Sequence, residues 1–380
     1  MFILSIIILA SCGGKNNPIL IALESKNTKI KKIINNVDEH ELQIIVSVIN
    51  KNKKVVDYKF NLNADNYYYP ASTVKLPISV FALEKINEYP LINIDTPYKI
   101  ENDTAFYTIR KDINEIMVMS SNESYNRLFE FLGQNYINYK LNEKGMTKSK
   151  IYHRLETKNA KNLETKELTF FINDSVIKFN KSYNKKTEPL KLNLLKKGVG
   201  YINGKGDLVR ESMDFSEKNY IPLEELHNLS KLLFFREQER KKNNLMLTEN
   251  QISFLMKSMN LSPNEIGYNS EEYPDTFSNL LVYGDIQKPI NGIKIYNKIG
   301  FAYGYVSETA FIETTKSSIT ISIALKVNNN QIFNDNEYEY EEIAFPFLAE
   351  FGREIIRIVN AKWYIWYPNQ TKIKPCPESY

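Results

Sequence analysis

A serine and a lysine three residues apart have the residue types and the spacing needed for acyl transfer. Ser72 and Lys75 occur in the segment Pro70-Ala71-Ser72-Thr73-Val74-Lys75. Residues three apart lie on one face of a helix, so the hydroxyl and the amine can meet. A serine is a weak nucleophile until a neighbouring base takes its proton. A lysine can be that base when burial or a second cation lowers its pKa.

Two other segments have the same spacing, from Ser175 to Lys178 and from Ser182 to Lys185. Both lie in a polar stretch rich in Lys and Asn, and we interpret both as coincidence. Ser72 differs because the residues after it include the apolar Leu76, Val80, Phe81 and Leu83. This pattern predicts a buried helix, and burial is what a neutral lysine requires.

Two further short segments carry groups that suit the same chemistry. Ser120-Ser121-Asn122 precedes a predicted helix, and Lys298-Ile299-Gly300 ends a predicted strand over residues 295–300. Each segment alone is common, since Ser258-Met259-Asn260 and Lys196-Lys197-Gly198 are similar. The order and context of all three together are much more specific.

In this order the segments resemble the S-x-x-K, S-D-N and K-T-G signatures of class A β-lactamases and penicillin-binding proteins. Asn126-Arg127-Leu128 and Phe301-Ala302-Tyr303-Gly304 extend the resemblance, which covers about residues 42–358. It implies an α/β (α+β) fold. We expect an antiparallel sheet flanked by N- and C-terminal helices, with an inserted, mainly helical domain.

The resemblance also implies a role for each of these residues. Ser72 would attack a carbonyl, Lys75 would activate it, and Ser120 would relay a proton to the leaving nitrogen. Asn122 would hold the substrate amide, and Lys298 would orient a substrate carboxylate.

Ile299, Gly300 and Phe301 would continue the substrate-binding edge beyond Lys298. The backbone N–H groups of Ser72 and Phe301 would form the oxyanion hole, in which a single donor is typically worth about 3 kcal/mol.

Three departures from the family pattern bear on the substrate. Ser121 replaces an Asp of largely structural role, and Ile299 replaces a Thr whose hydroxyl would bind a β-lactam carboxylate. The stretch between Asn126 and Lys298 is also longer, and its residues 178–203 could reshape the pocket. The substrate therefore remains open between a β-lactam, a peptidoglycan stem peptide and an unrelated ester or amide.

Glu156 is the candidate for the base that hydrolyses the acyl-enzyme. His153-Arg154-Leu155-Glu156 has the Arg-x-Glu spacing of the family's omega loop. Ala160 stands where the family has an Asn, while Asn159 and Asn162 are out of register. The alternative is a surface carboxylate paired with Lys158 or Arg154. A penicillin-binding protein of DD-peptidase type, or a single-turnover or non-catalytic cell-wall sensor, then remains as an alternative function.

Periodicity predicts the elements that position these residues. Residues 42–49 and 56–60 read as a hairpin, and 319–327 as a strand, because apolar and polar residues alternate. Pro222 and the capping box Thr248-Glu249-Asn250-Gln251 start helices, and residues 347–358 form a closing helix. We expect one catalytic domain over 26–365, with an α/β part (26–70 and 290–365), a helical part (71–289), and a tail over 366–380.

Composition narrows the partners and cofactors. The chain has 380 residues, with 49 basic and 45 acidic side chains, so it lacks the basic surplus of a nucleic-acid binder. Three His and two Cys without ligand spacing predict no metal, and we expect no cofactor and a monomer. No Gly-x-Ser-x-Gly elbow occurs, which disfavours a Ser-His-Asp hydrolase.

The first residues predict export. Residues 1–11 are an apolar run too short to span a bilayer, as in a signal peptide. Leu9-Ala10-Ser11-Cys12 resembles a bacterial lipobox, with Cys12 as the acylated residue and 12–25 as a tether. A buried N-terminal strand is the alternative. We expect a lipoprotein of the cell envelope, anchored to the membrane and facing the periplasm or exterior.

Overall fold

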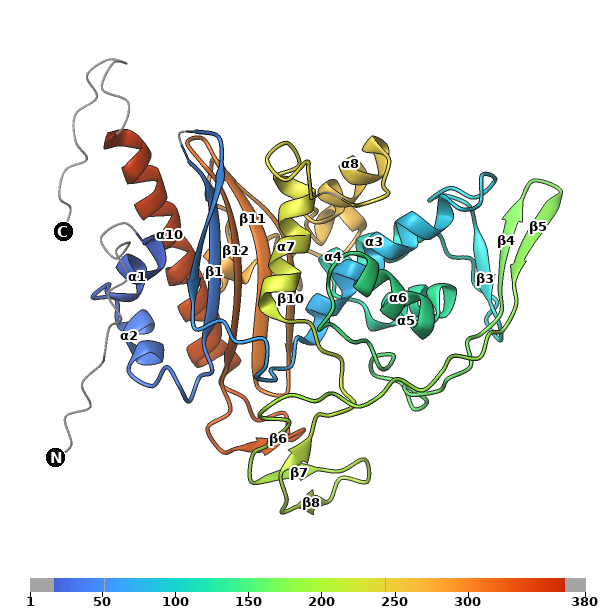
Figure 1. The fold of residues 1–380 in the computed structure, drawn as a ribbon, viewed down its shortest axis with the longest axis horizontal. Helices are drawn as coiled ribbons and strands as arrows, with labels where there is room; N and C mark the ends of the chain where they lie inside the picture. Colours follow the sequence, from blue (N-terminus) through green and yellow to red (C-terminus); the bar gives the residue numbers. More distant parts are fainter. Residues whose placement is uncertain (1–16, 51, 243, 366–380) are drawn as a thin grey trace.

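A five-stranded antiparallel sheet forms the framework of the molecule (Figure 1). The computed structural model describes residues 17–50, 52–242 and 244–365. The strands lie in the order β10, β11, β12, β1, β2, so the predicted hairpin pairs with the C-terminal strands. Their bounds are Gln43–Ile49 for β1, Val55–Phe60 for β2, Ile293–Ala302 for β10, Tyr305–Thr314 for β11 and Ser318–Lys326 for β12.

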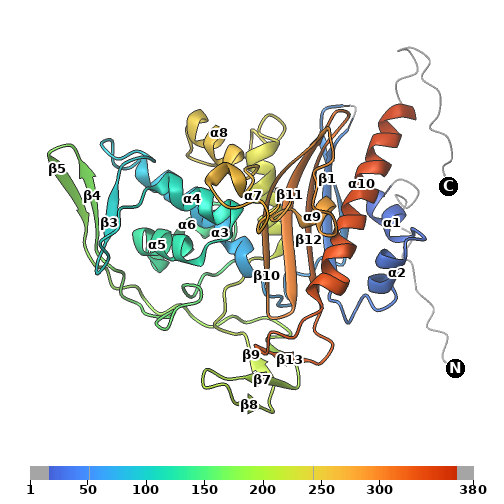
Figure 2. The ribbon, with the colours of Figure 1, turned by 180° about the vertical axis from the view of Figure 1, so that it is seen from behind.

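Helices from both ends of the chain cover one face of this sheet (Figure 2). They are α1 (Pro18–Leu23), α2 (Thr28–Ile34) and α10 (Phe345–Ile365). Apolar side chains of these helices and of the sheet form one buried core. The antiparallel sheet flanked by N- and C-terminal helices is thus confirmed.

Helix α7 (Leu223–Phe234) packs on the other face of the sheet. His227 is fully buried there, and its ring nitrogens lie 2.7 Å from Ser47 Oγ and 2.9 Å from Ser322 Oγ. The ring therefore links α7 to two strands of the sheet.

Most of the remaining helices form the inserted part, which has its own apolar core around α3, whereas α9 packs against α10 in the core of the sheet. Helix α8 starts at the predicted capping box, in which Thr248 and Gln251 bond reciprocally. The bounds are Lys75–Ile86 for α3, Ile109–Val118 for α4, Asn122–Leu132 for α5, Gln134–Glu143 for α6, Glu249–Ser258 for α8 and Leu280–Tyr283 for α9. Short turns of other helix types are η2 (Ala71–Val74), η3 (Asn264–Ile266) and η4 (Tyr340–Ala344).

The inserted part is less purely helical than the sequence predicts, because small sheets extend from it (Figure 1). One sheet pairs β3 (Tyr98–Ile100), β4 (Leu168–Ile172) and β5 (Ser175–Phe179). The others pair β6 (Lys196–Lys197) with β9 (Met213–Asp214), and β7 (Gly200–Ile202) with β8 (Leu208–Val209) and β13 (Ile332–Phe333). Most of these strands have two or three residues, too few to show a period in the sequence.

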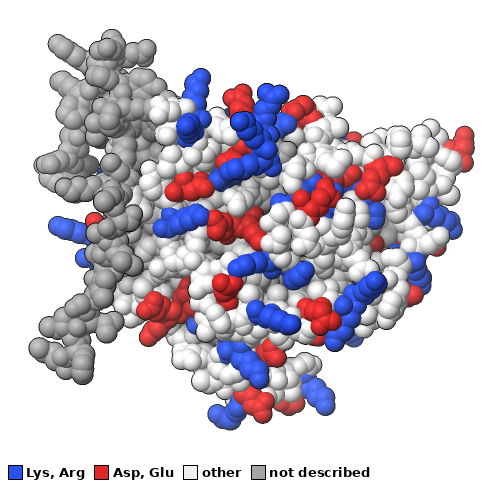
Figure 3. Space-filling model, viewed as in Figure 1, with Lys and Arg blue, Asp and Glu red and all other residues white. Residues whose placement is uncertain are grey.

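Acidic and basic side chains are interspersed over the face seen in Figure 3. None of the described helices is long and apolar enough to cross a membrane. The predicted signal peptide, Cys12 and the tail over 366–380 lie outside the described residues.

Candidate active site

Ser72 lies on a strained turn directly before α3. Ala71 has a left-handed φ of 48°, a region that residues with a Cβ rarely occupy. The turn is held because Thr73 N–H and Oγ1 and Ser307 Oγ all donate to the carbonyl of Pro70. Ser72 is half-buried and lines a cavity, and within the described residues its hydroxyl has no hydrogen-bond partner. The turn therefore presents a free hydroxyl to the cavity.

Lys75 begins α3 one turn after Ser72 and is completely buried. Its Nζ donates to the carbonyl of Ser120, to Ser120 Oγ (3.3 Å) and to Asn122 Oδ1 (2.6 Å). Burial lowers the pKa of Lys75 to about 7, against the opposing attraction of Glu156 and Glu123. At this pKa the amine is neutral in a large fraction of molecules near neutral pH, as a base for Ser72 must be.

Ser120 lies in the loop between α4 and α5, with a left-handed φ of 55° that directs its side chain into the site. Ser121 is the N-cap of α5, and its Oγ accepts from the backbone N–H of Ser124 at 3.2 Å. A serine here thus performs the capping that an Asp would also provide. The substitution of the family's Asp leaves the loop intact.

Lys298 contacts Ser120 from strand β10, whereas Lys75 contacts it from helix α3. Lys298 is fully buried, and its Nζ donates to Ser120 Oγ at 3.0 Å and to the carbonyl of Ile299 at 2.7 Å. Burial and then the nearby Lys75 hold its pKa well below the usual range. Ser120 Oγ therefore links the two lysines.

Gly300 allows β10 to approach the serine turn. A Cβ at this position would lie 2.4 Å from Ser72 N and 2.7 Å from Thr73 N. Real Cβ atoms do not come this close to backbone nitrogen, so only glycine fits without movement of the strand or the turn. This contact explains the glycine of the third segment in physical terms.

The edge of β10 directs alternate N–H groups toward the site. Asn297 N–H donates to the carbonyl of Met259, away from β11. In an antiparallel ladder this outward direction recurs at every second residue, so the N–H groups of Ile299 and Phe301 face outward as well. Phe301 N–H therefore has the orientation required of an oxyanion donor.

The side chain of Ile299 is 5 % exposed and lies in the core between the sheet and its outer helices. Directly across the strand pair, Glu308 is fully buried and accepts hydrogen bonds from Asn297 Nδ2 and Leu281 N–H. Burial raises the pKa of Glu308 to about 7. This carboxyl was missed in the sequence, although a Glu within an apolar strand is an available signal.

Glu156 lies on a loop that two contacts fix in place. Asn126 on α5 exchanges two hydrogen bonds of 2.8 Å with the backbone of Leu155, the preceding residue. Arg154 is buried and forms a bidentate pair with Glu130, with its Nε 2.5 Å from the carboxylate. Because Arg154 is engaged there, pairing of Glu156 with Arg154 is excluded.

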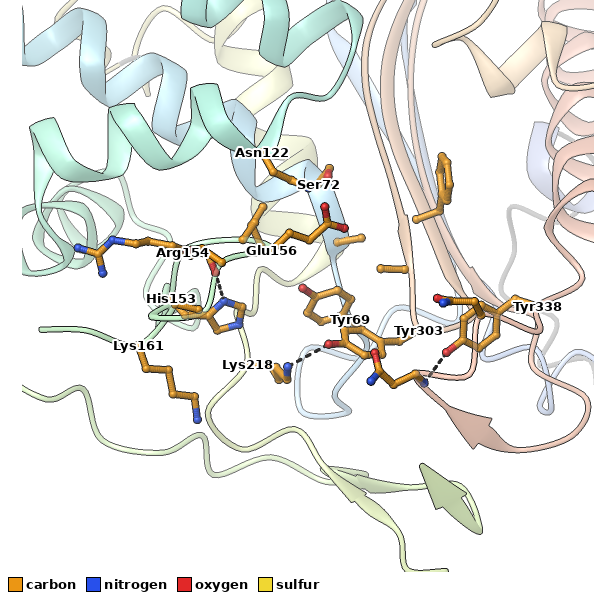
Figure 4. Close-up of a pocket in the computed structure, with 18 of the residues that line it drawn as sticks. Tyr69, Ser72, Asn122, His153, Arg154, Glu156, Lys161, Lys218, Tyr303 and Tyr338 are labelled. Carbon is orange, nitrogen blue, oxygen red and sulfur yellow. Dashed lines mark hydrogen bonds between the residues drawn. The ribbon is translucent and has the colours of Figure 1, made fainter. Parts of the chain in front are cut away.

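Glu156 is exposed, has a left-handed φ of 46°, and extends toward Ser72 and Asn122 (Figure 4). Asn162 uses its side chain locally, accepting from Glu164 N–H, and Asn159 is exposed. Neither Asn lines the cavity, whereas Ala160 does.

The cavity that contains Ser72 has a volume of about 520 Å³. Asn122 and Glu156 line one end, and aromatic residues missed in the sequence, Tyr69 and Tyr303, line the other (Figure 4). Lys218 donates to the Tyr303 hydroxyl at 3.1 Å. None of residues 178–203 lines this cavity, whereas Lys218 and side chains of the segment 334–340 do.

The other Ser-x-x-Lys segments lie elsewhere. Ser175 and Lys178 are on the exposed strand β5, and Ser182 binds Thr165 in a loop. Lys197 and Ser258, from the segments similar to the other two motifs, also lie outside the site: Lys197 pairs with Glu41, and Ser258 donates to Asn114.

Within the part of the chain that the structure describes, no three His, Cys, Asp or Glu side chains are grouped to hold a metal ion.

Comparisons with known proteins agree with this geometry. Residues 26–187 match the model of the Beta-lactamase enzyme family. The fold is similar to a β-lactamase from Sphaerobacter thermophilus (TM-score 0.50, 11% identity, covering 90% of this chain and 97% of the other). It is also similar to one from Xanthomonas campestris (TM-score 0.51, 12%, 90% and 99%) and to a halotolerant bacterial β-lactamase (0.50, 13%, 86% and 98%). No curated protein matches the chain.

The chain therefore has a β-lactamase-like fold, and its residues 26–187 are similar to the Beta-lactamase enzyme family.

Proposed function

We propose that this hydrolase cleaves an amide or ester through an acyl-enzyme on Ser72. The observation that carries the proposal is the buried network of Lys75, Ser120 and Lys298 beside a hydroxyl without a partner. Lys75 takes the proton of Ser72 as its Oγ bonds to the acyl carbon. Ser120, held between the two lysines, passes a proton to the leaving nitrogen or oxygen as the scissile bond breaks.

The developing oxyanion is stabilised by the N–H groups of Ser72 and Phe301. Asn122 orients the substrate, Lys298 positions Ser120, and Glu156 activates the water that releases the acyl group. The position of Glu156 on the cavity wall, on a loop fixed by Asn126, supports turnover over permanent acylation.

The substrate class that fits is a small acyl compound, with a β-lactam-like cyclic amide or a peptidoglycan-derived peptide as the candidates. Ile299 offers no hydroxyl to a substrate carboxylate, and its side chain is buried in the core, so we expect ordinary penicillins to react slowly. We further propose a monomer that is anchored to the cell envelope through a lipid on Cys12.

Covalent labelling tests the proposal. Ser72→Ala should abolish the mass shift produced by a β-lactam or a fluorophosphonate, because the acyl acceptor is gone. The variant should remain folded by circular dichroism, since a lost hydroxyl in a pocket costs about 1 kcal/mol or less. Ser182→Ala is the matched control and should be labelled as the wild type is. Labelling that persists in Ser72→Ala would refute the proposed nucleophile.

A further inference from the structure

A second cavity, of about 610 Å³, lies on the other side of Phe301 from the cavity that contains Ser72. Phe301, Tyr338 and Tyr340 line both cavities. The second cavity also reaches Ser120 and Ile299. Because Ser120 donates the proton to the departing atom in the proposed function, this second cavity is the place for the leaving group.

The walls of this leaving-group cavity are aromatic and partly open to solvent. The Phe301 ring packs on Tyr340 and Phe345, with centroid distances of 5.3 and 5.5 Å. Phe301 is 45 % exposed, and Phe277, on another wall, is 41 % exposed. Large exposed apolar side chains around one cavity are typical of a ligand-binding surface.

The charge of the cavity is negative. Among the described residues that line it, none is Lys or Arg, whereas Glu341, Glu342 and Asp285 are acidic. Asp285 is neutralised by Arg353 and Lys29, with N–O distances of 2.8 Å.

Glu341 and Glu342, by contrast, are exposed and form no ion pair within the described residues. Lys298 cannot offset them at close range, because its buried Nζ is bonded to Ser120 Oγ and the Ile299 carbonyl.

We infer that the enzyme selects a leaving group with an apolar body and a positive charge, such as an aromatic or aliphatic amine, over an anionic one. Two unpaired carboxylates attract a cation, and aromatic faces add cation–π attraction. The same charges repel a carboxylate on the leaving side, which is where a penicillin carries one. This inference rests on the proposed acyl-enzyme function and specifies its substrate class.

A matched series of esters tests the leaving-group preference. The m-carboxyphenyl, m-carbamoylphenyl and m-(aminomethyl)phenyl esters of phenylacetylglycine share one acyl group and differ in leaving-group charge. In each reaction the Ser72 ester bond forms and the aryl ester bond breaks. The phenol departs with a proton from Ser120, and water then releases phenylacetylglycine. Each kcat/KM is divided by the hydroxide-catalysed rate of the same ester, which removes the difference in intrinsic reactivity.

We expect the normalised kcat/KM of the cationic ester to exceed that of the anionic ester roughly threefold to tenfold, with the value for the neutral ester between them. The Glu341→Gln/Glu342→Gln double variant should bring the ratio close to one. Glu337→Gln is the control, because Glu337 is exposed on the same loop but does not line the cavity; its ratio should equal that of the wild type.

This inference would be overturned if the three esters reacted at equal normalised rates, if the anionic ester reacted fastest, or if the double variant kept the wild-type ratio. Each of these outcomes would leave the proposed acyl-enzyme function standing. If the wild type hydrolysed none of the three esters faster than Ser72→Ala does, the proposed function would be overturned, and this inference with it.

Discussion

Lys75 is the residue whose environment most directly determines the rate of acylation. Three oxygen atoms accept hydrogen bonds from its ammonium, yet burial dominates and lowers its pKa to about 7. The neutral amine predominates only above that pKa. Acylation of Ser72 should therefore increase about tenfold per pH unit below pH 7 and level off above it.

The pH profile of single-turnover acylation tests this prediction. Lys75→Met should lose both the rate and the ascending limb. Lys85→Met is the matched control, because Lys85 is a partly buried lysine of α3, outside the site, whose pKa is also lowered by burial, to about 8. A wild-type profile that is flat between pH 5 and 9 would argue against Lys75 as the base.

Glu156 determines the lifetime of the acyl-enzyme in our proposal. Glu156→Gln should leave acylation by Lys75 largely intact, because the carboxylate acts on the second step only. Deacylation should slow by roughly 100- to 10,000-fold, the usual contribution of a general base. Mass spectrometry would then detect an adduct on Ser72 that the wild type sheds rapidly.

Glu164→Gln provides the control for Glu156, since Glu164 is an exposed carboxylate of the same segment that does not line the cavity. Equal adduct lifetimes in Glu156→Gln and the wild type would exclude Glu156 as the base. A wild-type adduct that already persists for hours would mean that the loop supplies no base, as in a penicillin-binding protein.

At the scale of elements, the approach of β10 to the serine turn is the contact on which the site depends most. In Gly300→Ala the new Cβ would meet Ser72 N at 2.4 Å, and neither backbone can yield easily. We expect acylation to decrease at least 100-fold, because a misplacement of about 1 Å can have that effect.

Gly204→Ala is the control for this substitution, since an added Cβ there meets nothing within 4 Å. Circular dichroism and thermal unfolding would report whether Gly300→Ala retains the fold, and labelling of Ser72 would report the site. A Gly300→Ala enzyme that acylates at the wild-type rate would contradict the close contact.

The same scale shows which elements the sequence could predict. The alternation in residues 319–327 and the capping box at Thr248 predict β12 and α8, and both are present. The short strands of the inserted part, such as β6 and β9, contain two residues each and pair across long loops. Their formation depends on contacts distant in sequence, so no local pattern could reveal them.

At the scale of the whole molecule, the site combines segments separated by more than 200 residues. The three short segments identified Ser72, Ser120 and Lys298 because each carries its chemistry within three or four adjacent residues. The sequence did not indicate Glu308 or Lys218, because both bond to partners that no local spacing reveals. Glu308 bonds to Asn297, and Lys218 bonds to Tyr303. Periodicity predicts the order of the main strands and helices and the resemblance implies how they are arranged, whereas the cavity walls depend on loop placement.

The final prediction concerns where this molecule resides, and it depends on Cys12, which lies outside the described residues. A single acyl chain binds a membrane only marginally, whereas two or more chains anchor a protein firmly. A lipoprotein Cys carries several chains, so the wild type should sediment with membranes and remain there in high salt. Cys12→Ala should accumulate in the soluble or unprocessed fraction, with its labelling of Ser72 unchanged once the protein is folded.

Cys376→Ala is the control, as it removes the other cysteine but leaves the lipobox intact. Retention of Cys12→Ala in the membrane fraction at the wild-type level would show that the anchor is not a lipid on this residue.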